Sequence, residues 1–191
     1  METFEVCSTN VGSFGEANSV VLKNVFELLN KFKDDFGGYP AVFSAQESGK
    51  RKVAIPPVYS DGPIATDEDC RIENENGENI ARGVATYTLD PSKTRVVENK
   101  NKGFEVVTTI HTVSEVKGCT NANANRNRGT KDTDIGCISC YRNQTAVTAD
   151  DLQAYIEDII DMLNGVHHVR KIIVYGDFNT ETFFIKNLSL S

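Results

Sequence analysis

The sequence of 191 residues lacks any apolar run of about 18 residues, the length that a membrane-spanning helix requires. Its first five residues, Met-Glu-Thr-Phe-Glu, lack the basic start and apolar stretch of a signal peptide. Its five cysteines are odd in number and have no disulfide-framework spacing. Together these absences predict an intracellular protein, cytoplasmic or nuclear and not secreted, with free thiols and no membrane association.

Basic residues are in deficit, since 20 Lys and Arg stand against 27 Asp and Glu and leave a net charge of −7. A chain this acidic argues against a large non-specific nucleic-acid surface. It does not exclude an enzyme that holds phosphates through a metal ion and a few arginines. The hydrophobic content of 39% and the charged content of 25% are ordinary for a globular protein, and the length predicts one domain over 1–191.

Two segments repeat apolar residues at helical spacing. The first begins at Val21 and is stopped by two glycines after residue 36. The second follows Thr148, which forms a capping-box pattern with Asp151. Strand-like segments lie at 4–10, 39–45, 82–89, 103–116, 135–141 and 169–175, and long polar loops are expected at 48–80 and 117–133. This order predicts mixed α and β structure with helices packed on sheet faces.

The segment 171–179, Lys-Ile-Ile-Val-Tyr-Gly-Asp-Phe-Asn, carries the most functional information. Asp177 and Asn179 follow an apolar strand two positions apart, so both side chains point to the same side of an extended chain. They can reach one small target, such as a metal-bound phosphate or a water molecule. Sites gather at the carboxyl ends of strands in α/β folds. Taken alone, the segment fits an ordinary strand followed by a Gly-Asp/Asn turn equally well.

Five segments, in order along the chain, resemble motifs of the endonuclease/exonuclease/phosphatase superfamily, which has the deoxyribonuclease I-like fold. They are Thr9-Asn10-Val11, Ser44-Ala45-Gln46-Glu47-Ser48, Ala81-Arg82-Gly83-Val84-Ala85, Cys140-Tyr141-Arg142 and Gly176-Asp177-Phe178-Asn179. Each match is weak by itself, but five in the right order form a fairly specific signal. The spacing from Tyr141 through the second helix to Gly176 resembles the retrotransposon-type endonucleases in particular.

The resemblance implies a phosphodiesterase or endonuclease that hydrolyses nucleic-acid phosphate esters with Mg²⁺ or Mn²⁺. Glu47 would be the metal carboxylate with Asn10 beside it, because hard cations take oxygen ligands. Asp177 would orient or deprotonate the attacking water, and Asn179 would bind the phosphate or that water. Tyr141 would contact a non-bridging phosphate oxygen as charge builds there.

Basic residues near these motifs are expected to bind substrate. Arg142 would join the tyrosine on the phosphate, and Arg82 lies in the Arg-Gly-Val-Ala strand. Lys50 and Arg51 follow the Gln-Glu motif and would meet a phosphate backbone without specifying its sequence. The ordinary alternatives are a surface ion pair for Arg82 and a solvated loop for the 50–52 patch.

The superfamily fold is an α+β sandwich of two sheets with flanking helices, and its site also uses a later Asp and a terminal Asp-His pair. This chain ends at Ser191 without them, so we expect a C-terminally truncated sandwich. Three explanations stay open: the chain is a fragment of a longer protein, a second copy or a larger complex covers the sheet face left open, or the domain is a shortened descendant with a binding or structural role. His111 lies within a predicted strand, and 167–168 lie between helix and strand, so these histidines do not replace the missing pair. The enzyme is therefore expected to be incomplete or weakly active.

Two other functions stay open. A catalytically degenerate domain of the same fold would act as a binding or assembly subunit. A phosphatase would act on a small phosphorylated substrate. Clustering of Asn10, Glu47, Asp177 and Asn179 in one cleft would favour an enzyme, and a basic rim would favour nucleic acid as its partner.

The spacing of Cys137 and Cys140 is a weak zinc signal, because zinc needs two further ligands. Both residues fall on a predicted strand. An odd separation on a strand sends two side chains to opposite faces, so we do not expect this pair to share a metal ion.

Overall fold

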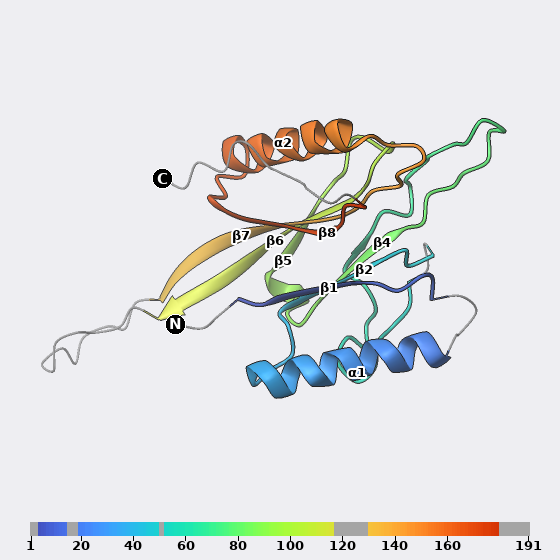
Figure 1. The fold of residues 1–191 in the computed structure, drawn as a ribbon. Coiled ribbons are helices and arrows are strands. Elements are labelled where there is room, and N and C mark those ends of the chain that lie inside the picture. The colour runs from blue at the N-terminus through green and yellow to red at the C-terminus, as the bar shows by residue number, and fades with distance from the viewer. Residues whose placement is uncertain (1–3, 15–18, 50–51, 117–129, 180–191) are drawn as a thin grey trace, which may run out of the picture.

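The computed structural model describes residues 4–14, 19–49, 52–116 and 130–179. In this part of the chain, two four-stranded sheets pack face to face, and a long helix lies on the outer side of each (Figure 1). The arrangement matches the expected α+β sandwich with flanking helices. The expected C-terminal truncation stays a prediction. No helix among the described residues has the length and apolar character needed to cross a membrane.

The first sheet has the strand order β1-β2-β4-β3. Its strands are β1 (Val6–Asn10), β2 (Val42–Gln46), β3 (Ala65–Thr66) and β4 (Val84–Thr88). Strands β1 and β2 are parallel, because helix α1 (Ser19–Phe36) carries the chain back between them, and Asn10 pairs with Gln46 in their register. The β2–β4 and β3–β4 pairs are antiparallel.

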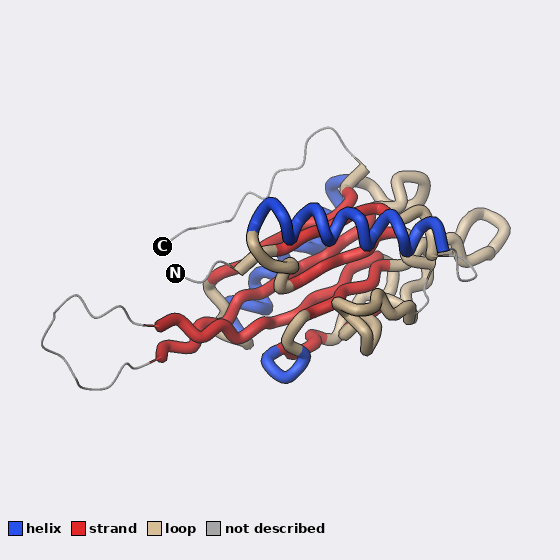
Figure 2. Tube along the Cα trace, turned by 90° about the horizontal axis from the view of Figure 1, so that it is seen from below, coloured by secondary structure: helices blue, strands red, loops and turns tan. Residues whose placement is uncertain are grey.

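The second sheet has the strand order β5-β6-β7-β8. A short 3₁₀ helix η1 (Pro91–Lys93) precedes β5 (Thr94–Val97), and β6 (Glu105–Val116), β7 (Thr130–Tyr141) and β8 (Lys171–Asp177) follow. Helix α2 (Ala149–Gly165) connects β7 to β8, so these two strands are parallel and Tyr141 pairs with Asp177. Figure 2 shows the β6–β7 hairpin projecting beyond one end of the sandwich.

Both predicted helices are confirmed, and each buries apolar residues at the predicted spacing. In α1, Val25 and Leu29 are buried, and the Gly37 N–H closes the helix on the Lys33 carbonyl at 2.8 Å. In α2, Thr148 Oγ1 accepts the Asp151 N–H at 3.1 Å, which is the predicted N-cap. The buried residues of α2 are Leu152, Ile156, Ile159, Ile160 and Leu163.

The space between the sheets changes character along the strands. At one end, a cluster that includes Val42, Ile135 and Ile173 is apolar. In the middle, the Ser44 and Ser139 hydroxyls of opposite sheets bond to each other, and the Gln46 amide donates to both. Because inward-facing residues alternate along a strand, this polar row leads directly to the strand ends at which the predicted site residues lie.

The predicted loops, strands and cysteine orientations agree with the structure to different degrees. In loop 48–80, the described residues form one named strand, the two-residue β3, in agreement with the predicted long loop. Strand β7 begins at Thr130, inside the segment predicted to be loop, because it pairs along the full length of β6. Strand β5 was not predicted. The two cysteines of β7 lie in different apolar clusters, Cys137 between the sheets and Cys140 beneath α2, which confirms that they face opposite ways.

Candidate functional site

Four of the predicted site residues meet where strands from both sheets end. Asn10 is the last residue of β1, Tyr141 of β7 and Asp177 of β8, while Glu47 directly follows β2. Two parallel pairs, β1–β2 and β7–β8, put these carboxyl ends on the same edge of the sandwich. The topology therefore brings together side chains that lie far apart in the sequence.

One amide group joins the two carboxylates. The Asn10 side chain donates from Nδ2 to Glu47 Oε1 at 2.8 Å and to Asp177 Oδ2 at 2.9 Å. Its Oδ1 accepts the Gly12 N–H at 2.9 Å, which fixes the orientation of the amide. The nitrogen of Asn10, and not its oxygen, thus faces the carboxylates. Donation to both oxygens offsets part of the repulsion between two negative groups at close range.

The Tyr141 hydroxyl is part of the same cluster, because it hydrogen-bonds to Glu47. Burial first, and then the charge and hydrogen bond of Glu47, raise the pKa of Tyr141 to about 12. The charges of Glu105 and Asp177 make smaller contributions to the same increase. At neutral pH the side chain is therefore a protonated donor aimed at an acidic site.

Uncommon backbone conformations also gather here. Glu47 and Asn179 have positive φ angles, of 53° and 46°, which non-glycine residues seldom adopt. Gly176 has a φ of 141°, and a Cβ built on it would lie 1.9 Å from the Cys140 carbonyl oxygen. Only glycine fits at that point between β7 and β8. Such conformations persist where the surrounding structure enforces them, and they cluster at functional sites.

The loop after β8 is braced from within. The Asn179 backbone N–H donates to Asp177 Oδ1 at 3.0 Å, and its side-chain Nδ2 donates to the Arg142 carbonyl at 2.8 Å. The Arg142 guanidinium donates to the carbonyls of Phe178, at 2.7 Å, and Asn179, and to that of Val147 at 3.4 Å. The guanidinium that was expected on a phosphate thus lies on carbonyls of the loop that follows Asp177.

The other expected substrate-binding residues lie at the rim or outside the described part of the chain. Arg82 is exposed and lies two residues before β4, and its carbonyl accepts the Gly49 N–H at 2.9 Å. Lys50 and Arg51 lie outside the described residues. The basic rim that would favour nucleic acid was expected from Lys50, Arg51, Arg126 and Arg128, which all lie outside the described residues, so it stays a prediction.

Sequence reasoning missed Glu105, which is only 1% exposed beneath the cluster. Its Oε1 accepts backbone N–H groups from Arg82 and, at 2.6 Å, from Gly83. The available signal was an acid within the predicted strand 103–116, which is otherwise rich in β-branched residues. A carboxylate is rarely buried without partners, so its place in an apolar strand indicates an internal role.

The donor set suits a hard divalent cation. Among the described residues, no three His, Cys, Asp or Glu side chains are grouped so that they could hold a metal ion by themselves. Mg²⁺ commonly uses one or two carboxylates and completes its shell with water and substrate phosphates. Glu47 and Asp177 supply two carboxylates that share the Asn10 amide as a donor. A cation would favour the space between these two carboxylates. Asn10 would offer oxygen only after its amide turned.

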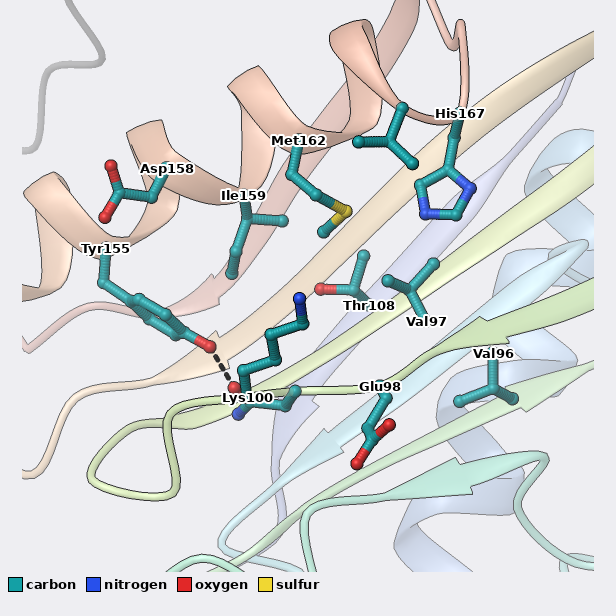
Figure 3. Close-up of a pocket in the computed structure, with 12 residues that line it drawn as sticks. Val96, Val97, Glu98, Lys100, Thr108, Tyr155, Asp158, Ile159, Met162 and His167 are labelled. Atoms are coloured by element: carbon teal, nitrogen blue, oxygen red, sulfur yellow. Dashed lines mark hydrogen bonds between the residues drawn. The ribbon is translucent and has the colours of Figure 1, made fainter.

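A separate pocket lies on the far side of the second sheet, between α2 and β5 (Figure 3). It has a volume of about 390 Å³ and is lined by apolar side chains such as Val97, Ile159 and Met162. The Tyr155 hydroxyl at its edge donates to the Asn99 side chain. The pocket contains none of the clustered residues, so we assign the candidate site to the carboxylate cluster, where polar groups converge.

No protein-family model and no curated protein sequence matches the chain. Among solved structures, the human nocturnin catalytic domain with a bound sulfate anion aligns over 97% of this chain and 69% of that domain. The TM-score is 0.52 and the sequence identity 16%. A humanized D. rerio TDP2 with 14 mutations aligns over 97% of this chain and 66% of its own, with 11% identity. Its TM-score of 0.38 is too low to support a shared fold.

The likeness to the nocturnin domain concerns the fold. It supports the expected two-sheet sandwich with flanking helices, at a sequence identity of 16%. At this identity the likeness says nothing of activity. The particular similarity to retrotransposon-type endonucleases stays a prediction.

Proposed function

We propose that this chain is a metal-dependent phosphoesterase that hydrolyses phosphodiester bonds of nucleic acids at the Asn10–Glu47–Asp177 cluster. The observation that carries this proposal is the Asn10 side-chain nitrogen, which lies within 2.9 Å of an oxygen of each carboxylate. Two carboxylates that share one donor repel each other, and a bound cation would offset that repulsion.

Glu47 is the carboxylate that would hold Mg²⁺ or Mn²⁺, with Asn10 beside it. When bound, such a cation would neutralise charge on the phosphate and on the leaving oxygen. The positive φ of Glu47 supports this role, because it turns the side chain away from the path of β2 and toward the ends of β1 and β8.

Asp177 would orient the attacking water and accept its proton. Its Oδ2 is bound to Asn10 and its Oδ1 to the Asn179 N–H, so the carboxylate is held from both sides. Asn179 would contribute this N–H, and its side chain would reach the phosphate or water only by leaving the Arg142 carbonyl. A positioned carboxylate base of this kind contributes about 10²- to 10⁴-fold in rate.

Tyr141 would donate its proton-bearing hydroxyl to a non-bridging phosphate oxygen as negative charge develops. Its hydroxyl stays protonated throughout the neutral pH range and can therefore donate a hydrogen bond there. Arg142 would keep Asp177 in place by holding the carbonyls of residues 178 and 179. We propose Arg82, Lys50 and Arg51 as contacts for the phosphate backbone outside the reacting group.

A second candidate is an assembly role, and the sheet edges favour it. Among the described strands, β1 pairs only with β2 and β8 pairs only with β7, so each has an edge with no strand beside it. Partly buried apolar side chains, among them Phe4, Ile173 and Tyr175, pack against the apolar cluster between the two sheets. A second copy or a larger complex that covered this side would bury them.

Nicking of supercoiled plasmid DNA tests the proposed function. Purified protein with Mg²⁺ or Mn²⁺ is expected to nick the plasmid, and Glu47→Gln and Asp177→Asn should each lower the rate about 100-fold or more. Asp134→Asn is the matched control, because this carboxylate pairs with Arg95 away from the cluster. Folded wild-type protein without nicking activity would favour the assembly role, and cleavage of p-nitrophenyl phosphate alone would indicate a small-substrate phosphatase.

A further inference from the structure

A buried carboxylate lies directly beneath the segment that follows β2. Glu105 is 1% exposed and begins β6, where it pairs with Tyr141 across the β6–β7 register. Its Oε1 accepts two consecutive backbone N–H groups, from Arg82 and, at 2.6 Å, from Gly83. Hydrogen bonds from amides to a carboxylate are about twice as strong as those between neutral groups. Glu105 therefore holds two adjacent peptide groups at the start of β4.

The same two residues hold the segment that carries Glu47. The Ser48 N–H donates to the Gly83 carbonyl at 3.0 Å, and the Gly49 N–H donates to the Arg82 carbonyl at 2.9 Å. The two residues immediately after Glu47 are thus bonded to the two residues that Glu105 binds. A continuous path of hydrogen bonds runs from the Glu105 carboxylate to the backbone on which Glu47 is mounted.

Glu47 needs such support, because its φ of 53° is in a region that non-glycine residues seldom occupy. A residue keeps this conformation only where its surroundings enforce it. Its neighbours on the N-terminal side are held by β2, in which Gln46 pairs with both Asn10 and Val84. On the C-terminal side, the bonds to Arg82 and Gly83 perform the equivalent task.

We infer that Glu105 is a positioning residue that fixes the direction of the Glu47 side chain through the peptide groups of Arg82 and Gly83. Without the carboxylate, the Arg82 and Gly83 N–H groups would lose their shared acceptor. The carbonyls of the same two residues, which accept the Ser48 and Gly49 N–H groups, would then no longer be fixed in place. Glu47 would then sample other backbone conformations and leave the Asn10–Asp177 cluster. This inference rests on the proposed role of Glu47 as a metal ligand, so its test needs a readout that is independent of that role.

Asp67 offers a matched control. It is also a buried carboxylate, 7% exposed, and its Oδ1 accepts the Val84 N–H at 2.6 Å. The Val84 carbonyl accepts the Asp67 N–H in return, so this contact lies on the β3 side of β4, away from Glu47. Glu105→Gln and Asp67→Asn are equally conservative, and both weaken the hydrogen bonds of a buried carboxylate to consecutive amides, those of residues 82 and 83 just before β4 and that of Val84, its first residue.

The experiment measures Mn²⁺ binding by electron paramagnetic resonance and amide hydrogen exchange at Ser48 and Gly49, in the full chain and both variants. Glu105→Gln is expected to weaken Mn²⁺ binding about 10-fold and to speed exchange at Ser48 and Gly49. Asp67→Asn should leave both quantities at wild-type values. Equal effects of the two variants, or none from Glu105→Gln, would overturn the inference.

Failure of the proposed function gives a different result. Wild-type protein that binds no Mn²⁺ would reject Glu47 as a metal ligand, while exchange at Ser48 and Gly49 would still decide the positioning role. If Glu105→Gln does not fold, exchange in the wild-type protein is decisive. The amides of Ser48 and Gly49 must then be protected from exchange as strongly as that of the β2 residue Ala45, and rapid exchange at either would refute the positioning role of Glu105.

Discussion

Asn10 and Asp177 are 167 positions apart in the chain, yet the Asn10 Nδ2 donates to the Asp177 Oδ2 at 2.9 Å. The contact joins the last residues of β1 and β8, which belong to different sheets. The bond to Asp177 therefore links the two sheets at the candidate site, and the same nitrogen also donates to Glu47, which follows β2 of the first sheet. The chemistry of the Asn10 amide gives the most direct test of whether a cation belongs there.

Asn10→Asp replaces the shared donor by a third carboxylate. Without divalent metal, we expect this variant to be less stable by about 1 kcal/mol, since two hydrogen bonds to partly exposed carboxylates become repulsive contacts. Mg²⁺ should restore the loss, because a cation then has three carboxylates to join. Denaturant unfolding with and without Mg²⁺ measures the effect. Asn24→Asp, on the exposed face of α1, should show no Mg²⁺-dependent gain, and an equal gain there would contradict the prediction.

Glu47→Gln is expected to lower the pKa of Tyr141 from its value of about 12. The substitution removes a negative charge beside the hydroxyl, and that charge opposes formation of the tyrosinate. The pKa should remain above the ordinary value of about 10, because burial and the charges of Glu105 and Asp177 persist. Titration of tyrosine ¹³Cζ resonances by NMR gives the pKa directly. An unchanged pKa would mean that Tyr141 and Glu47 are not in contact in solution, and Asp134→Asn serves as the control that should change nothing.

His111 is expected to make the protein less stable in acid. It is 4% exposed, bonded to the Thr94 and Thr109 hydroxyls at 3.1 and 2.8 Å, and burial lowers its pKa to about 4. Below its ordinary pKa of about 6.5 the unfolded chain binds the proton while the folded chain does not. The free energy of unfolding is therefore unaffected by His111 above pH 6.5. It falls as the pH drops toward 4, by roughly 3 kcal/mol in total.

Denaturant unfolding between pH 7 and pH 4 measures this loss. His111→Gln should remove this part of the slope, since glutamine does not titrate, although the substitution itself lowers stability at every pH. The prediction is wrong if the His111 variant loses stability over the same pH range as steeply as the wild type.

Arg142→Lys separates a loop brace from a phosphate contact. Lysine keeps the positive charge but cannot reach three carbonyls at once, because it lacks the planar guanidinium. If Arg142 braces the loop, the variant should lose about 10-fold or more in kcat with little change in KM, and exchange at the Asn179 amide should quicken. If the guanidinium instead binds phosphate as a charge, lysine should retain most of kcat. Steady-state kinetics on a DNA substrate, with Arg170→Lys as the exposed control, distinguishes the two cases.

Local patterns in the sequence were sufficient for the elements that bury one face. Apolar spacing placed α1 and α2 within a few residues of their ends, since a helix must turn Val25 and Leu29, or Ile156 and Leu163, to the same side. Alternation placed the cysteines of β7 on opposite faces. The motif residues were recognisable as strand-end polar groups, and their expected neighbours in space follow from two parallel strand pairs.

Tertiary structure alone decided what these residues bind. Strand β5 has only four residues, all of them partly or fully exposed, and it forms because it pairs with β6, so no apolar periodicity marks it in the sequence. The orientation of the Asn10 amide, the carbonyl partners of Arg142 and the grip of Glu105 on β4 all depend on groups distant in sequence. A sequence determines which faces are apolar through local spacing. Which hydrogen-bond donor meets which acceptor depends on how the two sheets pack, and that packing is specified by residues from the whole chain acting together.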